Sequence, residues 1–235
     1  VSRQSDDKAA FDMSEETALL ALSSLMSSPI KDVKIEFQGG EPLLNFELIR
    51  FIVVQGKRLA TNADKRVSFV ITTNLALISD DILAFCKEHE ILISTSLDGP
   101  ADLHNANRPR RGNNSHELAV TGIRRSAEHL GEDRVAALMT TTKASLGQVE
   151  DIIDEYRRNG LHEIFLRPMS PYGFAVKTKW FKAYDEQEWI DFYRRGLRYI
   201  IDMNRRGEHM VELYALTILA KMLTGRPGGF VDMMN

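Results

Sequence analysis

The chain has 235 residues, of which 43% are hydrophobic and 27% are charged, as in an ordinary folded protein of one or two domains. Its formal net charge is -3, from 30 basic and 33 acidic residues, so overall charge gives no reason to expect binding to nucleic acid or to an anionic membrane. No apolar run approaches the roughly 20 residues of a membrane-spanning helix, and the first residues do not form a secretory signal peptide.

A single cysteine limits the redox chemistry of this sequence. Cys86 follows Phe85 on the apolar side of an expected helix, where a small core residue is the usual role. An intramolecular disulfide is impossible, which is consistent with a reducing cytoplasm. An iron–sulfur cluster requires several thiolates, so this sequence cannot hold one by itself. No histidine pair has metal-ligand spacing, and we expect a cytoplasmic protein without metal ligands in this sequence.

Short β-rich runs alternate along the chain with longer amphipathic segments. Ser14 is expected to cap the first helix, and Ser79 another. The expected strands cover 33–37, 67–71, 91–96, 135–139 and 162–167. The other expected helices cover 46–59, 79–89, a segment starting at Ser115, 146–158, 185–206 and 210–223. Such alternation predicts an α/β fold with parallel strands, and leaves open both a (β/α) barrel and a doubly wound sheet.

Polar and glycine-rich segments follow the first expected strand. In parallel α/β folds, ligands bind beyond the carboxyl ends of the strands. Gln38, Gly39, Gly40, Glu41 and Pro42 occupy that position. Two glycines allow positive φ and close approach of the backbone to a ligand, and a carboxylate beside free carbonyls suits an ammonium group. The alternative is a plain glycine turn with an exposed glutamate.

The next two strand ends repeat this polar character. Thr72, Thr73 and Asn74 end the second strand, and Ser96 and Asp98 lie at the end of the third. Each set alone is compatible with ordinary loop chemistry, because these residue types dominate turns. Three polar strand ends on one rim together predict a ligand site.

A connection longer than most runs from residue 98 to 115 and contains His104 and Arg108. Arg108 is placed to fold back and fork a ligand carboxylate, although a solvated basic surface is the usual alternative. His104 has no metal-ligand partner in the sequence, and we expect it to hydrogen-bond within the loop. At the end of the fifth strand, Arg167 is an anion-binding candidate and Leu166 a candidate for lining an adenine pocket.

Taken in order, these segments resemble the motifs of a known superfamily. Gly39-Gly40-Glu41-Pro42, then Thr73-Asn74, then Ser96-Leu97-Asp98-Gly99-Pro100 with His104 and Arg108 resemble the radical S-adenosylmethionine (SAM) superfamily. The similarity is to the peptide-modifying branch that includes anaerobic sulfatase-maturating enzymes and other maturases with a C-terminal SPASM domain. It covers residues 2–166, and 165–168 with 172–175 look closest to the His-Xaa-Ser system radical SAM maturases.

The resemblance implies a fold and a set of binding residues. The fold would be a partial (β/α)6 TIM-like barrel, with the first strand and the cluster loop upstream of Val1. Residues 1–170 would form the barrel core, and 171–235 a helical extension leading toward a SPASM or auxiliary-cluster domain. Gly39, Gly40 and Glu41 would bind the methionyl amino group, Arg108 the SAM carboxylate and Ser96 the ribose. Gln38 and Leu166 would line the nucleoside site, and Asn74 completes the implied cofactor-binding set.

The same resemblance implies the chemistry. The family carries a CxxxCxxC loop that holds a [4Fe–4S] cluster, and no such motif occurs in this sequence. We therefore expect the chain to be cut downstream of that motif and to be inactive alone. In the full-length protein, reductive cleavage of SAM would give a 5′-deoxyadenosyl radical that takes hydrogen from a peptide substrate. The implied protein is an oxidoreductase that matures a peptide or small protein and receives electrons from a flavodoxin or ferredoxin.

Two other functions compete with this interpretation. A metal-dependent or Schiff-base barrel enzyme would need a strand-end lysine or clustered His and Asp ligands, and neither stands out. A SAM- or peptide-binding barrel module without a cluster and without catalysis is the second alternative. Neither reading requires nucleic acid or a membrane.

Overall fold

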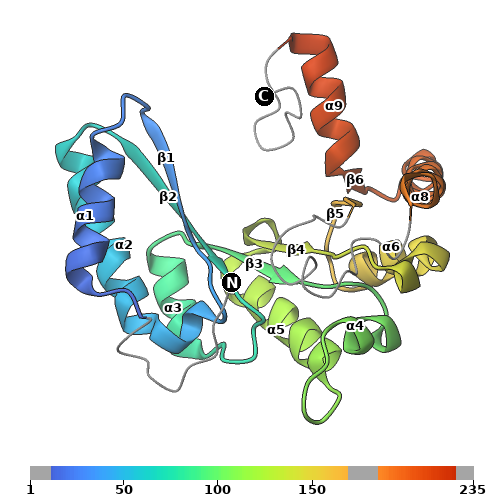
Figure 1. The fold of residues 1–235 in the computed structure, drawn as a ribbon, viewed down its shortest axis with the longest axis horizontal. Helices are drawn as coiled ribbons and strands as arrows, with labels where there is room; N and C mark the ends of the chain where they lie inside the picture. Colours follow the sequence, from blue (N-terminus) through green and yellow to red (C-terminus); the bar gives the residue numbers. More distant parts are fainter. Residues whose placement is uncertain (1–11, 169–184, 226–235) are drawn as a thin grey trace. The chain divides into compact units, whose positions relative to one another are not determined.

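The structure is a computed structural model that describes residues 12–168 and 185–225 (Figure 1). Contacts between residues divide the chain into two compact units. The first unit comprises Val1–Thr95 and Arg125–Val135, and the second comprises Ser96–Arg124 and Ala136–Asn235.

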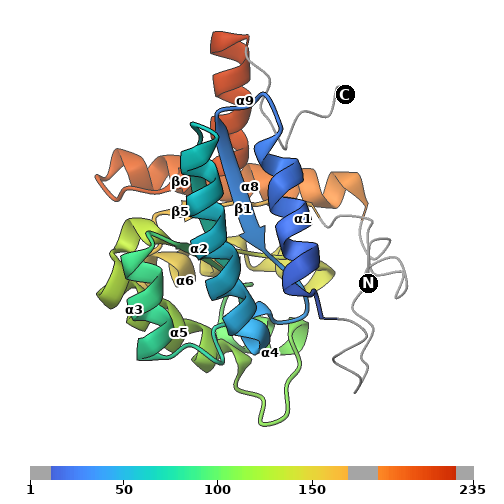
Figure 2. The same ribbon diagram turned by 90° about the vertical axis from the view of Figure 1, so that its left-hand side faces the viewer.

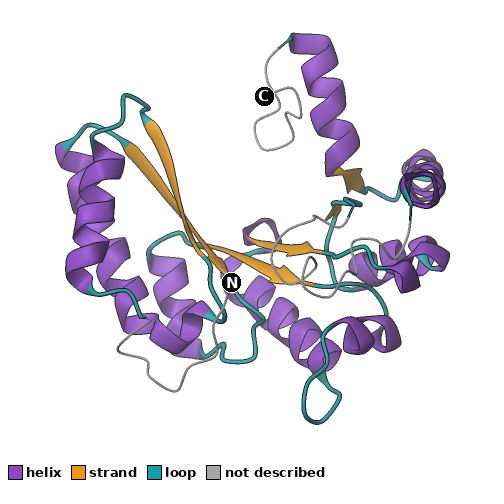
Figure 3. Ribbon diagram, in the orientation of Figure 1, coloured by secondary structure: helices purple, strands orange, loops and turns teal. Residues whose placement is uncertain are grey.

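Three parallel strands organise the first unit. They are β1 (Asp32–Phe37), β2 (Arg66–Thr72) and β3 (Leu92–Ser96), drawn as arrows in Figure 3. Ile35 pairs with Phe69 in register, and Ile71 pairs with Ile93. All four side chains are buried or half-buried, as expected of parallel strands with covered faces. The strand prediction for this part of the sequence is confirmed.

The helices of the first unit include α1 (Glu15–Met26), α2 (Phe46–Asn62) and α3 (Asp80–Glu88). Figure 2 shows α1 and α2 on the same side of β1. The predicted caps are present, because Ser14 accepts a hydrogen bond from Thr17 N and Ser79 accepts one from Ile82 N. The core of the unit contains Leu22, Phe37, Ile49, Ile52, Val53, Phe69, Ile71, Phe85, Cys86 and Ile91. Cys86 is therefore a core residue, as predicted, and burial raises the pKa of its thiol to about 12.

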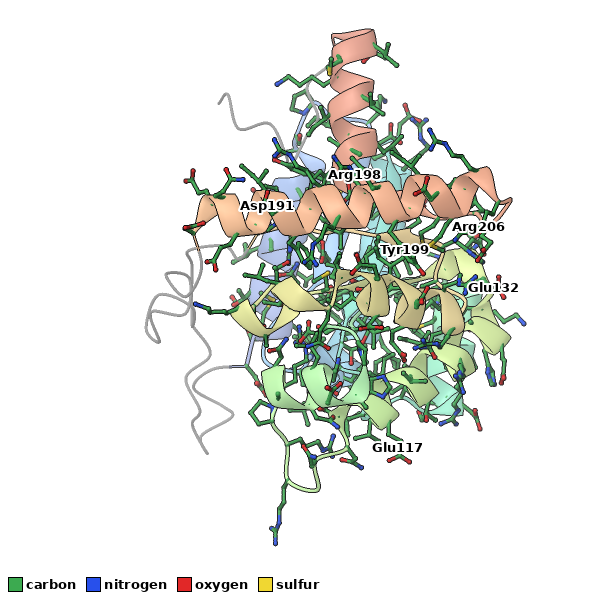
Figure 4. The ribbon with its side chains drawn as sticks, turned by 90° about the vertical axis from the view of Figure 1, so that its right-hand side faces the viewer. Glu117, Glu132, Asp191, Arg198, Tyr199 and Arg206 are labelled. Carbon is green, nitrogen blue, oxygen red and sulfur yellow. The ribbon has the colours of Figure 1, made fainter. Side chains whose placement is uncertain are left out.

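Helices make up most of the described residues of the second unit. Its longest helix, α8 (Glu186–Arg205), packs on α6 (Val149–Arg158). Tyr199 points from α8 toward α6 and donates a hydrogen bond to Asp154 Oδ1 at 2.9 Å (Figure 4). Among its described residues are also α4 (Ala101–Asn107), part of α5 (Ser115–Leu130), most of β4 (Val135–Leu138), β5 (Glu163–Ile164), β6 (Val211–Glu212) and α9 (Leu213–Thr224).

Three details differ from the sequence prediction. The expected loop over 98–115 contains α4, which begins directly after Pro100. The fifth strand is short and pairs in parallel with β6, where a helix was expected. One reason is that Leu166 N donates to the carboxylate of Glu212 and does not extend the strand, and Pro168 has no N–H to donate.

The observed class is a mixed α/β fold with parallel strands. The first four strands form one sheet in the order β1-β2-β3-β4, and β5 and β6 form a second sheet. This agrees with the predicted class at the level of α/β with parallel strands. No helix within the described ranges is long and apolar enough to cross a membrane. The predicted loop at 172–175 falls outside the described residues.

Candidate functional site

Glu41 links the ends of two strands in the first unit. It precedes a short 3-10 helix, η2 (Pro42–Asn45), and its Oε1 accepts a hydrogen bond from Leu43 N at 3.2 Å. The same oxygen accepts from Thr73 Oγ1 at 2.6 Å, and Oε2 accepts from Asn74 N at 2.9 Å. The structure therefore brings Glu41, Thr73 and Asn74 together, as expected for residues at neighbouring carboxyl ends. Much of the hydrogen-bonding capacity of the carboxylate is used by the protein itself.

The two glycines before Glu41 border open space. A Cβ added to Gly39 or to Gly40 would meet no atom within 4 Å, and neither residue has positive φ. The expected use of positive φ is thus wrong, and space beside the backbone is the property that these residues provide. Gln38 is exposed, and its Nε2 donates to Glu36 Oε1 at 2.6 Å.

A tight turn shapes the end of β2. Asn74 Oδ1 accepts from Ala76 N at 2.9 Å, and Leu75 N donates to Thr73 Oγ1 at 3.1 Å. Leu75 has φ of 61°, which is uncommon for a bulky residue, and its side chain is buried. The bonds from Asn74 N to Glu41 and from Leu75 N to Thr73 hold this conformation. The side chain of Asn74 stays exposed at the surface.

Arg108 is paired with Asp98 in the second unit. Its Nε donates to Asp98 Oδ2 at 2.8 Å, and its Nη2 donates to Asp98 Oδ1 at 3.1 Å. Nη2 also lies 3.3 Å from Thr140 Oγ1, and Thr140 N donates to Asp98 Oδ1 at 2.8 Å. The arginine does fold back to the strand end, as predicted, but the Nε–Nη2 edge of its guanidinium is bound to a protein carboxylate. Nη1 takes part in none of these bonds.

His104 is buried beneath this pair. Its Nδ1 accepts a hydrogen bond from Asp98 N at 3.1 Å, so the predicted role within the loop is confirmed. Burial lowers the pKa of His104 to about 4, the charge of Asp98 opposes this shift, and Arg108 and His116 add to it. His104 is therefore neutral at pH 7, which leaves Nδ1 free to accept the bond.

The two other predicted residues of the second unit differ in exposure. Ser96 is the last residue of β3 and is half-buried. Leu166 is fully buried, and a Cβ added to Gly196 of α8 would lie 2.7 Å from its Cδ1. Its backbone is also engaged, because Leu166 O accepts from Trp189 Nε1 at 3.3 Å. The nucleoside role assigned to Leu166 stays a prediction.

Two residues that contact Arg108, Asp98 and Thr140, were not predicted as its partners. Asp98 belongs to the motif at the end of the third predicted strand, which assigns it no role, and Thr140 lies in none of the predicted motifs. A signal existed for Thr140, because Thr140, Thr141 and Thr142 form a polar run after β4, as at the other strand ends. Its pairing with Asp98 depends on a contact between distant parts of the sequence, which no local pattern contains.

In the described part of the chain, no group of three His, Cys, Asp or Glu side chains could hold a metal ion. The first unit offers open backbone at Gly39 and Gly40, and the second offers the Nη1 edge of Arg108. Taken separately, backbone carbonyls suit an ammonium group and a guanidinium edge suits a carboxylate.

Sequence comparisons give a match along most of the chain and shorter matches to other proteins. No family profile matches the chain. The chain is 28% identical to an uncharacterized protein of Methanothermobacter thermautotrophicus, over 97% of this chain and 82% of that protein. It is 29% identical to a radical SAM cyclopropyl synthase of Paramaledivibacter caminithermalis, over 48% of this chain and 22% of that enzyme. It is 37% identical to a cysteine-type anaerobic sulfatase-maturating enzyme of Clostridium perfringens, over 31% of this chain and 20% of that enzyme.

Solved structures share the fold. The chain superposes on the anaerobic sulfatase maturase anSMEcpe with bound AdoMet, with a TM-score of 0.73 and 16% identity. The superposition covers 91% of this chain and 58% of the anSMEcpe chain. The complex of anSMEcpe with AdoMet and the Cp18Cys peptide gives a TM-score of 0.74 at 19% identity. This chain therefore spans little more than half of these structures, and the shared fold and partial matches support the resemblance to radical SAM enzymes.

Proposed function

We propose that the chain is the SAM-binding core of a radical SAM enzyme that modifies a peptide or small protein. In this proposal residues 1–170 form a partial (β/α)6 barrel core and 171–235 a helical extension toward a SPASM domain. A His-Xaa-Ser type maturase is the narrower form of the same proposal. The fold shared with AdoMet-bound anSMEcpe over 91% of the chain is the observation that carries it.

The proposal assigns a role in SAM binding to each residue of the predicted cofactor-binding set. In the first unit, the backbone around Gly39 and Gly40 would accept hydrogen bonds from the methionyl ammonium, with Glu41 fixing that turn. Gln38 and Asn74 would lie beside it. In the second unit, Arg108 would bind the carboxylate, and Ser96 and Leu166 would contact the nucleoside. The task of these residues is to bind and orient the cofactor and to exclude water.

The cluster would come from outside this sequence. When bound and reduced through a [4Fe–4S] cluster, SAM supplies a 5′-deoxyadenosyl radical that removes a hydrogen atom from the substrate. A cluster needs several thiolates, whereas the sequence has one cysteine, which is buried. The proposal therefore places the cluster ligands upstream of Val1 and assigns electron supply to a flavodoxin or ferredoxin.

A peptide substrate is proposed on two grounds. One solved neighbour, anSMEcpe, is described with a bound peptide, and another relative is a sulfatase-maturating enzyme. The motifs at the strand ends also resemble the peptide-modifying branch.

The test uses the full-length gene product after anaerobic reconstitution with iron and sulfide. Dithionite and SAM are added, and 5′-deoxyadenosine is measured by liquid chromatography. We expect this product to form, and we expect Arg108→Ala to reduce it. Intact SAM with no 5′-deoxyadenosine would rule out the enzymatic proposal.

One observation favours a second candidate, a SAM- or peptide-binding module without catalysis. The only cysteine of the sequence is a core residue, so these residues alone hold no cluster. This candidate predicts that the full-length protein binds SAM without releasing 5′-deoxyadenosine. The same assay, combined with a binding measurement, separates the two.

A further inference from the structure

Asp98 is a buried carboxylate that accepts hydrogen bonds from Arg108 and from the backbone of Thr140. Its side chain is 1% exposed, whereas that of Arg108 is 35% exposed. Arg108 donates to both carboxylate oxygens, and Thr140 N donates to Oδ1. The cation and the backbone amide together compensate the cost of burying this charge.

The backbone around Asp98 is also fixed. Asp98 N donates to His104 Nδ1, and Tyr156 OH donates to the carbonyl of Leu97 at 2.8 Å. Gly99 follows with φ of 133°, and a Cβ there would lie 2.7 Å from Ile152 Cγ1. The carboxylate is thus held in place from the β3 end and from the β4 end.

A fixed carboxylate determines the orientation of the guanidinium. The group is planar, and Nε and Nη2 form a two-point fork with Asp98. The fork leaves the plane no freedom to rotate, and the Nη1 edge is directed away from the buried carboxylate. An arginine without this partner would populate several rotamers and would lose more entropy on binding an anion.

We propose that Asp98 is a positioning residue that holds Arg108 so that Nη1 is presented to the carboxylate of SAM. The ligand in this statement rests on the proposed function. Asp98 itself does not touch the cofactor, and acts through Arg108.

Two ligands separate this role from a general effect on the fold. One is SAM, and the other is decarboxylated SAM, which keeps the adenosine, sulfonium and amine but has no carboxylate. We expect Asp98→Asn and Arg108→Ala each to raise the Kd for SAM by about tenfold or more, the loss expected for a charge-assisted hydrogen bond. Both variants should bind decarboxylated SAM within about twofold of wild type, because the lost contact is absent there. Equal weakening of both ligands, or unchanged SAM affinity, would overturn the proposal.

A matched control and a second variant complete the experiment. Asp32 forms the same kind of fork with Arg66 on an exposed surface of the first unit, so Asp32→Asn should change neither affinity. Arg108→Lys keeps the charge beside Asp98 but has no planar fork, and should reproduce the selective loss of SAM if Asp98→Asn does not fold. Wild-type affinity of Arg108→Lys for SAM would show that charge alone suffices, against the proposal.

A measurement without ligand distinguishes failure of this inference from failure of the proposed function. We expect the Nε–H of Arg108 to exchange slowly with solvent in the free wild-type protein, by nitrogen-15 NMR, and rapidly in Asp98→Asn. If wild type binds neither ligand, the SAM proposal fails, and this exchange alone decides whether Asp98 positions Arg108. Equally fast exchange in both proteins would contradict the positioning role.

Discussion

Glu41 and Arg108 are the charged residues of the predicted cofactor set, and both already bind protein groups. Glu41 accepts three hydrogen bonds from its own unit, and Arg108 donates two to Asp98. What is left for a ligand is backbone beside Gly39 and Gly40 and the Nη1 edge of Arg108. At the scale of residues, Glu41 and Arg108 therefore hold the local structure of their own units as well as being candidates for contact with a ligand.

Replacing Glu41 should lower the stability of the first unit. Glu41→Gln keeps the shape but places an amide N–H₂ where Asn74 N or Thr73 Oγ1 now donates, so one of these donors loses its partner. We expect the free energy of unfolding to fall by about 1–3 kcal/mol in urea titrations. Glu47→Gln is the control, because the side chain of Glu47 is 89% exposed. Equal stability of both variants would contradict the structural role of Glu41.

His104 should make stability depend on pH. Its pKa is about 4 in the folded protein, below the ordinary value of 6.5, because burial disfavours the charged form. Between these values the unfolded chain binds a proton that the folded chain does not, so the free energy of unfolding falls as pH drops from 6.5 to 4. We expect this one group to contribute a loss of about 2–3 kcal/mol.

The variant His104→Asn isolates this effect. Its side-chain oxygen still accepts from Asp98 N and does not titrate, so wild type should lose stability relative to the variant as the pH falls. Urea unfolding at pH 7, 5.5 and 4.5 measures the difference. Parallel curves for the two proteins would show that His104 does not titrate in this range.

At the scale of elements, close approach between backbone and side chains fixes the second unit. Gly99 joins β3 to α4 with positive φ and meets Ile152 of α6, and Gly196 lets α8 approach Val149 and Leu166. The contact of Gly99 with Ile152 places the segment that carries Asp98 against α6, and the contacts of Gly196 bring α8 close to α6 and to Leu166.

Gly99→Ala should be far more costly than a matched glycine replacement. Gly99 has both a left-handed φ and no room for a Cβ, whereas Gly207 has φ of 85° and open space around it. We expect Gly207→Ala to lower the free energy of unfolding by about 1 kcal/mol and Gly99→Ala by about 3 kcal/mol or more. Similar losses in thermal or urea unfolding would show that the contact with Ile152 relaxes at little cost.

The sequence predicted elements better than it predicted contacts. Caps at Ser14 and Ser79 and the first four strands follow from local periodicity and from polar residues that satisfy helix N–H groups. The helix α4 and the pairing of β5 with β6 were missed, because short elements depend on tertiary partners such as Glu212.

In the candidate site, too, the residue types were predictable from the sequence and their contacts were not. The polar strand ends were visible from residue types alone, and Glu41 does meet Asn74. The fork between Asp98 and Arg108 was not predicted, since a motif shows which residues are present but not which are already paired. The open space beside Gly39 and Gly40 also required coordinates, because the sequence suggested positive φ as the reason for these glycines.

At the scale of the whole molecule, the predicted binding residues divide between the two units. The first unit holds Gln38 to Asn74 and the second holds Ser96, Arg108 and Leu166. The proposed function predicts that the affinity for SAM depends on the backbone around Gly39 and Gly40 and on Arg108. This is the central claim of the proposed function, and it can be tested with one variant in each unit.

The most direct measurement is calorimetric titration of SAM into the reconstituted full-length protein and two variants. Gly40→Ala fills open space in the first unit without a contact within 4 Å, and Arg108→Ala removes the guanidinium of the second unit. We predict unchanged folding of Gly40→Ala and a Kd for SAM raised about tenfold or more in both variants. Binding of SAM at wild-type affinity by either variant, or no binding by the wild-type protein, would contradict the account.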